Sequence, residues 1–238
     1  MNEIGTTNQK MRESWLDKTL KNIPRDSKIL DAGAGELQYK KFCEHLNYFS
    51  QDFGQYDGKG NAEGLQTKKF DNSKLDILSD ITKIPAEDAS FDAIMCIEVL
   101  EHILEPIKAI KELSRLLKVN GKLLITAPFC SLTHFAPYHF STGFNKYFYE
   151  EAFKTSGFKI LEIIPNGNYY EYIAQEIRRL PSIIKKYSGC KINIFERIFI
   201  KLILSILNKY NKKDKGGVKR IIVFWLPCFS SKSKIINS

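Results

Sequence analysis

The chain of 238 residues has few of the side chains that build metal or disulfide centres. Its four histidines are scattered without ligand spacing, and no two cysteines form a CxxC pair. Zinc centres have regularly spaced Cys and His ligands, so we expect no metal site. An odd number of cysteines in apolar surroundings indicates reduced, buried thiols of a cytoplasmic protein. The five cysteines are Cys43, Cys96, Cys130, Cys190 and Cys228.

Long apolar segments are also missing. No run of 18 uncharged apolar residues occurs, so no helix is expected to span a membrane. The first eight residues are polar and lack the core of a signal peptide. No internal repeat stands out. The length suits one α/β domain with an appendage, so we expect a single domain over residues 1–238 that begins with a helical segment at 1–26.

Acidic residues are scarce near the C-terminus. Residues 178–238 carry 15 Lys and Arg against two Asp and Glu, whereas residues 1–177 have a net charge of −4. The overall charge of +9 therefore belongs to the appendage, and the rest of the chain is mildly acidic.

The most informative motif is Ile-Leu-Asp-Ala-Gly-Ala-Gly at residues 29–35. A short apolar strand ends in Asp31 and runs into Gly33 and Gly35, which allow a sharp turn and close approach to a ligand. Residues 36–45 look helical, so we expect the loop at a helix N-terminus. A dinucleotide-binding loop needs a third glycine where this chain has Gln38. Asp31 would repel a pyrophosphate, but it suits the cationic amino and sulfonium groups of S-adenosylmethionine.

Two further acids follow at the ends of expected strands. Asp52 closes an aromatic-rich strand 21 residues after Asp31, a spacing that suits a carboxylate bound to ribose hydroxyls. Asp80 stands just before Ile81. A carboxylate beside an aliphatic side chain can bind adenine, because the acid accepts from the exocyclic amine while the apolar group covers the ring.

Residues 91–97 form a nearly continuous apolar run, which is typical of a strand covered on both faces. The segment from Glu98 to His102 follows it. A helix is expected next, with apolar residues at helical spacing from Ile107 to Leu117. Asn120 and Gly121 then predict its C-cap, ahead of another buried strand at 122–128.

Taken in order, these segments resemble the class I S-adenosylmethionine-dependent methyltransferases, in particular the type 11 small-molecule branch. The resemblance covers about residues 27–165. It rests on the Asp31–Gly35 loop, Asp52, the Asp80–Ile81 pair, Phe91–Asp92, Glu98–His102 and Leu116–Leu123. The chain departs from the family at Ala34, where Cys is frequent, and at Glu36–Leu37, where a further glycine is frequent.

The resemblance implies an α/β, Rossmann-like fold. We expect a seven-stranded, mostly parallel sheet with helices on both faces, an antiparallel last strand and a helical insertion before it. The cofactor would be S-adenosyl-L-methionine. Its expected site residues are Asp31, Gly33, Ala34, Gly35, Asp52, Phe53, Asp80, Ile81, Ile97, Glu98 and His102.

Residues 128–149 are predicted to form an acceptor lid on the 27–165 core. The segment follows a strand whose carboxyl end should face the ligand crevice, and it is dense in aromatic residues. Methyl transfer to a hydroxyl needs a general base, and His139 and His134 are the candidates. The alternative is that the aromatic side chains only complete the core. We expect a small-molecule acceptor, for which a saccharide or a lipid-linked intermediate is suited to aromatic faces.

The closing antiparallel pair of the sheet is predicted at residues 157–164 and 218–226. Between them lies a basic helical insertion at 168–215, with one helix from Tyr169 to Leu180 and a second, largely apolar one at 192–207. Basic clusters flank the second helix. Residues 185–220 could contact a membrane peripherally, or they could cap the lid or pack in a homodimer, and from the sequence we favour the cap or dimer.

Three other functions compete with a small-molecule methyltransferase. The basic C-terminal region could serve a nucleic-acid methyltransferase, but its aromatic residues lie in an apolar helical pattern and no RNA-binding module is visible, so we expect no nucleic-acid partner. A non-catalytic scaffold would not need Asp31, Asp52 and Asp80 at three ligand-facing strand ends. Gln38 argues against a dehydrogenase. We therefore expect a cytoplasmic methyltransferase enzyme.

Overall fold

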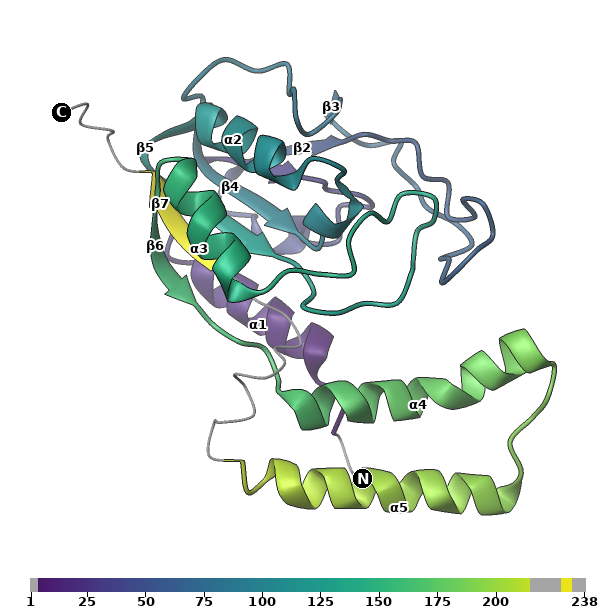
Figure 1. Ribbon diagram of the computed structural model, residues 1–238. Coiled ribbons are helices and arrows are strands. Elements are labelled where there is room, and N and C mark those ends of the chain that lie inside the picture. Colours follow the sequence, from purple (N-terminus) through teal and green to yellow (C-terminus); the bar gives the residue numbers. More distant parts are fainter. Residues whose placement is uncertain (1–3, 215–227, 233–238) are drawn as a thin grey trace. The chain divides into compact units, whose positions relative to one another are not determined.

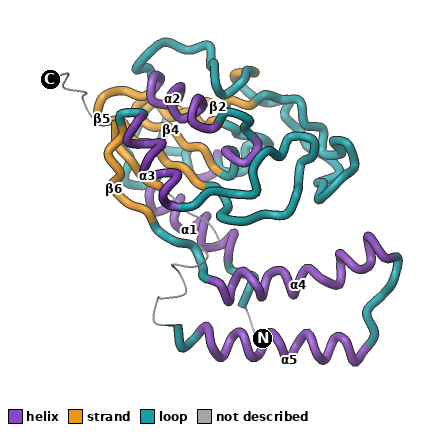
Figure 2. Tube along the Cα trace, viewed as in Figure 1, coloured by secondary structure: helices purple, strands orange, loops and turns teal. Residues whose placement is uncertain are grey.

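The structure is a computed structural model that describes residues 4–214 and 228–232. The chain folds into two compact units. One comprises residues 15–164 with 225–238, and the other comprises residues 1–14 with 165–224. Among the residues that the structure describes, all strands lie in the first unit, and long helices dominate the second (Figure 2).

The first unit is built on one mixed sheet with the strand order β3-β2-β1-β4-β5-β7-β6 (Figure 1). Every pairing from β3 to β5 is parallel, while β7 pairs antiparallel with both β5 and β6. The strands are β1 (Lys28–Ala32), β2 (Asn47–Asp52), β3 (Ile77–Leu78), β4 (Phe91–Ile97), β5 (Leu117–Thr126), β6 (Phe158–Ile163) and β7 (Cys228–Lys232).

Helices cover both faces of this sheet, as the sequence predicts. On one face, Leu16 and Leu20 of α1 (Asn8–Leu20) pack with alternate residues of β4, Ala93, Met95 and Ile97. Helices α2 (Pro106–Leu116) and α3 (Lys146–Thr155) lie over the opposite face (Figure 1). Every residue of β4 except one is therefore buried, which explains its continuous apolar sequence.

The helix predicted at residues 36–45 is wrong. The segment forms turns and one short 3-10 helix, η1 (Lys40–Phe42). Leu37 has φ +60°, and Gly35 before it has φ +50°. An α-helix cannot begin through two left-handed residues, because successive helical hydrogen bonds require right-handed backbone.

The predicted C-cap at Asn120–Gly121 is also wrong. Helix α2 ends at Leu116, and β5 begins at once at Leu117. Asn120 does adopt the left-handed conformation typical of a turn residue, with φ +66°, but it lies inside β5. The register of β4 against β5 shifts beside it, so the left-handed residue marks an irregularity of the strand.

The end of the chain also differs from expectation. The last strand predicted at 218–226 lies outside the described residues, and the described strand that pairs with β5 and β6 is Cys228–Lys232. The helix expected to stop before Pro181 instead runs on as α4 (Tyr169–Ser188). Pro181 removes one backbone donor from this helix without ending it.

In the second unit, α4 and α5 (Ile194–Asn211) form a helical hairpin (Figure 1). A small apolar core lies within this unit. Ile4, Ala174 and Leu204 form that core. Asn193 caps α5 in a reciprocal pair with Glu196, which satisfies two backbone donors at the helix start. No helix within 4–214 is long and apolar enough to cross a bilayer.

The packing of α1 on the sheet can be tested at Leu16, which is fully buried. Leu16→Ala should lower the free energy of unfolding by about 2–5 kcal/mol, because it removes buried methyl groups and leaves a cavity. Met11 lies on the same helix but is exposed. Met11→Ala should change the free energy by less than about 0.5 kcal/mol. Urea denaturation of both variants measures the difference, and equal effects would contradict this packing.

Candidate active site

The carboxyl ends of five parallel strands meet at one edge of the sheet. Strand β1 lies between β2 and β4, so the chain leaves β1 and β4 in opposite directions, and in open α/β sheets this is the position where ligands bind. Asp31 lies within β1, Asp52 ends β2, and Asp80 follows β3. The fold therefore brings the three predicted acids to adjacent strand ends.

The glycine loop after β1 directs its backbone amides into the protein. The N–H groups of Gly33 and Ala34 both donate to the carbonyl oxygen of Gln51, each at 2.8 Å. The N–H of Gly35 donates to Oδ2 of Asp52 at 3.0 Å. A phosphate-binding loop leaves such amides free for its ligand and leads into an α-helix. In this loop the amides already have partners within the protein, and no α-helix follows directly. The geometry agrees with the argument from Gln38 against a dinucleotide.

Glycine is required at position 33. Gly33 has φ +81°, and a Cβ atom added there would lie 2.4 Å from Cγ2 of Val99, the residue just after Glu98. The loop after β1 thus touches the loop after β4 directly. Any larger residue would push these two strand ends apart.

Asp52 is held rigidly at the end of β2. Its Oδ2 accepts from Gly35, and its Oδ1 accepts from the N–H of Gly54 at 3.0 Å. Each carboxylate oxygen has a further lone pair, so the side chain is fixed and can still accept from two ligand hydroxyls. The next residue, Phe53, is partly exposed and meets the ring of Tyr138 edge-on, with 4.8 Å between centroids.

Asp31 is buried, with 1% of its surface exposed. Burial raises its pKa to about 7; the hydrogen bond from Tyr48 opposes this rise, and the charge of Asp52 adds to it. The Tyr48 hydroxyl donates to Oδ2 of Asp31 at 2.7 Å. A cation placed beside Asp31 would favour the ionised form. Sequence reasoning missed Tyr48, although its position on β2, next to β1, is a signal for it.

The third acid is less enclosed. Asp80 is exposed, and its Oδ1 accepts from the N–H and the hydroxyl of Thr82 at 2.7 and 2.8 Å. Ile81 beside it is buried. The N–H of Ser79 donates to the backbone carbonyl of Asp52, so the end of β3 is fixed to the end of β2.

Residues after β4 are fixed to β5. Ile97 is buried at the end of β4. Glu98 adopts φ +58°, and its Oε1 accepts from the hydroxyl of Thr126 at 2.9 Å. Its backbone N–H donates to the carbonyl oxygen of the same threonine at 2.9 Å. The short 3-10 helix η2 (Leu100–His102) follows and carries His102.

Three histidines gather beyond η2. The ring centroids of His102 and His134 are 4.7 Å apart, and those of His134 and His139 are 4.6 Å apart. Burial and the neighbouring His134 lower the pKa of His102 to about 3, and the same two causes lower the pKa of His139. The structure therefore joins one predicted cofactor residue and both predicted bases in one cluster.

The loop after β5 is anchored around this cluster. The N–H groups of Phe140 and Ser141 both donate to the backbone carbonyl of Glu101. Phe135 stacks on Tyr56, with 4.5 Å between centroids, which ties this loop to the one that follows β2. Glu101 itself is buried and faces two of the histidines. Sequence reasoning used Glu101 only as part of a motif and gave it no role in the site.

Comparison with known proteins agrees with this geometry. Residues 30–125 match the family model described as a methyltransferase domain. An uncharacterized protein of Methanocaldococcus jannaschii is 33% identical over 173 residues, which cover 72% of this chain and 67% of that protein.

Solved structures share the fold at low identity. An S-adenosylmethionine-dependent methyltransferase of Archaeoglobus fulgidus superposes with a TM-score of 0.58 at 15% identity, covering 94% of each chain. The phosphoethanolamine N-methyltransferase 2 of Haemonchus contortus, solved in complex with S-adenosyl-L-methionine, has a TM-score of 0.53 at 16% identity and covers 94% of this chain and 53% of that one.

Strand order, the glycine loop and the acids at the strand ends thus agree with the sequence match. The chain belongs to the class I S-adenosylmethionine-dependent methyltransferases, enzymes whose cofactor is S-adenosyl-L-methionine.

Proposed function

We propose that this enzyme transfers the methyl group of S-adenosylmethionine to a small molecule held between the end of β4 and the loop at 128–145. The cluster of His102, His134 and His139 supports this proposal, because it gathers three imidazole rings, with centroids 4.6 to 5.8 Å apart, on the segments that follow β4 and β5. The cofactor supplies an electrophilic methyl carbon. A lone pair of the acceptor forms the new bond, and the carbon–sulfur bond breaks with its electrons on sulfur.

We assign the cofactor contacts from the strand ends outward. Asp31 pairs with the cationic amino group, and Asp52 accepts from the ribose hydroxyls. Asp80, Ile81 and Phe53 surround the adenine. The remaining wall consists of Gly33, Ala34, Gly35, Ile97, Glu98 and His102. Support comes from the buried Asp31 and from the fixed orientation of Asp52.

If the acceptor is a hydroxyl, its proton needs a base, and His139 and His134 are the two candidates. His139 contacts the Ser131 hydroxyl, with 3.2 Å between Nε2 and Oγ, whereas Nε2 of His134 faces Glu101. His139 is therefore the better-placed base. The exposed ring of Phe140 beside it suits a saccharide or a lipid-linked saccharide as acceptor.

The ribose contact predicts that Asp52→Ala weakens binding of S-adenosylhomocysteine by about 1–3 kcal/mol, the usual effect of losing a hydrogen bond to a charged group. Asp57→Ala is the matched control, since Asp57 also accepts two backbone amides but is exposed in the following loop. Titration calorimetry measures both variants. If Asp52→Ala and Asp57→Ala bind S-adenosylhomocysteine with the same affinity, Asp52 does not contact the ribose. If the wild-type protein binds NAD more tightly than S-adenosylhomocysteine, the proposed cofactor site is wrong.

The amino-group contact predicts proton release on binding. Burial raises the pKa of Asp31 to about 7, so near neutral pH a substantial share of the molecules carry this proton before the ligand binds. A cationic ligand favours the carboxylate and expels the proton. Calorimetry in two buffers of different ionisation enthalpy should show this release in the wild type and not in Asp31→Asn. Equal proton release in both proteins would contradict the contact.

The raised pKa of Asp31 also makes the free energy of unfolding depend on pH. The pKa of Asp31 is raised in the folded protein, so the folded state holds the proton more tightly than the unfolded state between about pH 4 and 7. The contribution of Asp31 therefore becomes less favourable as pH rises through this range. Asp31→Asn should flatten the curve of unfolding free energy against pH.

We also propose that α5 lies on an anionic membrane surface. One face of α5 carries apolar residues at helical spacing, all exposed; Phe195 and Phe199 are 70% and 65% exposed. The opposite side of the helix holds Leu204, which is buried in the core of its unit. The exposed face comprises Phe195, Ile198, Phe199, Leu202 and Ile206.

The charge next to this face favours a lipid partner over a second copy of the chain. Lys201 and Lys209 lie on α5, and Lys185 and Lys186 end α4. Each copy of the chain carries these lysines beside the helix, so two such surfaces would repel each other, whereas anionic headgroups would attract both. An apolar helical face flanked by lysine is typical of helices that lie in the membrane interface.

This surface predicts that the protein sediments with anionic vesicles of phosphatidylglycerol and phosphatidylcholine and not with pure phosphatidylcholine. Binding should fall with added salt, because exposed charges are screened over roughly 8–10 Å at physiological ionic strength. The double variant Ile198→Asn/Leu202→Asn should lose binding, and Leu104→Asn, exposed outside this helix, should retain it. A variant that changes only the oligomeric state in ultracentrifugation would show that a second copy covers the face.

A further inference from the structure

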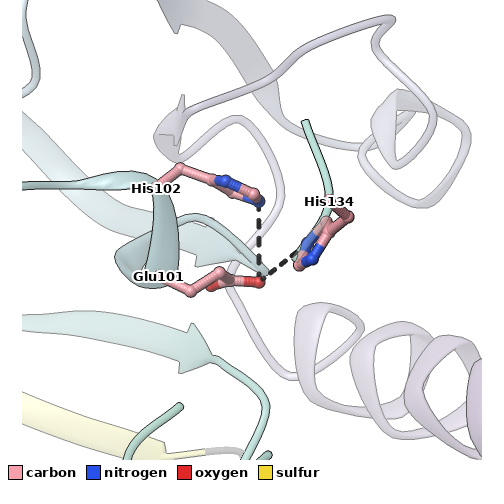
Figure 3. Close-up of side chains that lie close together, drawn as sticks. All are labelled: Glu101, His102 and His134. Atoms are coloured by element: carbon pink, nitrogen blue, oxygen red, sulfur yellow. Dashed lines mark ion pairs between the residues drawn. The ribbon is translucent and has the colours of Figure 1, made fainter. Parts of the chain in front are cut away.

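Glu101, His102 and His134 direct three potential ligand atoms toward one point (Figure 3). Oε1 of Glu101 lies 3.8 Å from Nε2 of His102 and 4.0 Å from Nε2 of His134. All three ligand atoms lie within 4.8 Å of one another. They come from two segments, η2 after β4 and the loop after β5, so the cluster exists only in the folded protein.

The other nitrogen of each histidine faces a backbone carbonyl. Nδ1 of His102 lies 2.6 Å from the carbonyl oxygen of Tyr138, and Nδ1 of His134 lies 2.9 Å from that of Leu132. A carbonyl can only accept, so each Nδ1 must carry the hydrogen. The lone pair of each neutral ring is then on Nε2, the atom that faces Glu101. Metal-binding histidines are oriented in this way, with the second nitrogen donating to a carbonyl or carboxylate.

We propose that Glu101, His102 and His134 bind a divalent transition-metal ion such as Zn²⁺. Two nitrogen ligands and one carboxylate form the donor set of zinc sites that keep a position open for substrate. Two ligands that are each about 2 Å from an ion lie at most about 4 Å apart, so both pairs with Glu101 already satisfy this limit. The two histidines need to approach by less than about 1 Å.

The burial of the cluster suits an ion. Glu101 is 1% exposed, and its carboxylate lies opposite the Nε2 atoms of both histidines. A carboxylate taken out of water is stabilised by a cation beside it. The side chains of His102 and His134 remain 14% and 23% exposed, so the site is not closed to solvent.

The role of the ion rests on the proposed function. With three protein ligands, the ion keeps room for an oxygen atom of the methyl acceptor. A hydroxyl bound there would have a lowered pKa and lose its proton to His139 or to water. The oxygen would then form a bond to the methyl carbon as the carbon–sulfur bond breaks. The site would therefore select acceptors with a hydroxyl, and in particular vicinal hydroxyls that can chelate the ion.

The test measures metal binding directly. The full chain is freed of metal with a chelator and titrated with Co²⁺, which reports its ligands in the visible spectrum, and with Zn²⁺ by calorimetry. We expect one ion per chain and no thiolate charge-transfer band, because none of the ligands is a cysteine. Binding of S-adenosylhomocysteine is measured on the same samples.

His134→Ala and Glu101→Gln should each weaken Co²⁺ binding by at least about 100-fold. Mutation of a residue that only hydrogen-bonds to a metal ligand already lowers metal affinity by about 10–100-fold, and loss of a ligand itself should lower it further. His45→Ala is the matched control, because His45 contacts the backbone of Leu20 and lies outside the cluster. The conservative glutamine keeps the shape of the buried glutamate. Melting temperatures of all variants establish that they fold.

The outcomes separate this proposal from the proposed function. A wild-type protein that binds S-adenosylhomocysteine but no Co²⁺ would overturn the metal site alone. Equal losses in His134→Ala and His45→Ala, or a thiolate band, would also overturn it, since the ion would then be held elsewhere. Specific Co²⁺ binding without S-adenosylhomocysteine binding would support the metal site and refute the proposed use of the cofactor.

Discussion

Five parallel strands must end at the same edge of the sheet, and the rest of the site depends on this constraint. Because β1 lies between β2 and β4, the chain leaves β1 and β4 in opposite directions at this edge. The loops after β1 and β4 are nevertheless in close contact, since the position of Gly33 has no room for a Cβ beside Val99. The acids come from β1 and β2, and the histidines come from η2 and the loop after β5.

The glycine loop shows why a general strand–loop motif can serve different ligands. In a dinucleotide site the free amides of such a loop are the binding groups, and a helix dipole behind them strengthens the attraction for anions. Here the amides of Gly33, Ala34 and Gly35 are already bonded to Gln51 and Asp52, and no α-helix follows. The loop therefore offers carboxylates and packing, which suit a cationic nucleoside and do not suit a pyrophosphate.

The sequence predicts most of the strands because a fully covered parallel strand has a continuous apolar pattern, and β4 is found at the predicted residues 91–97. It predicts turns less well. Leu37 has a left-handed backbone that prevents the expected helix at residues 36–45, and Asn120 has one that makes β5 irregular. The spacing of apolar residues reveals neither conformation. In the site, acids at strand ends could be named from spacing, whereas Glu101 and Tyr48 could not, because their partners come from other segments. The convergence of His102 with His134 likewise depends on how the loop after β5 folds back.

The two units differ in net charge. The unit that carries the strand ends, residues 15–164 with 225–238, has 21 Lys and Arg against 21 Asp and Glu, and it buries one of these acids, Asp31, within β1. The basic charge and the exposed apolar face of α5 belong to the other unit, residues 1–14 with 165–224. The proposed membrane contact and the proposed cofactor contacts therefore draw on different residues. Substitutions on the exposed face of α5 leave every residue proposed to bind the cofactor intact, so the two proposals can be tested separately.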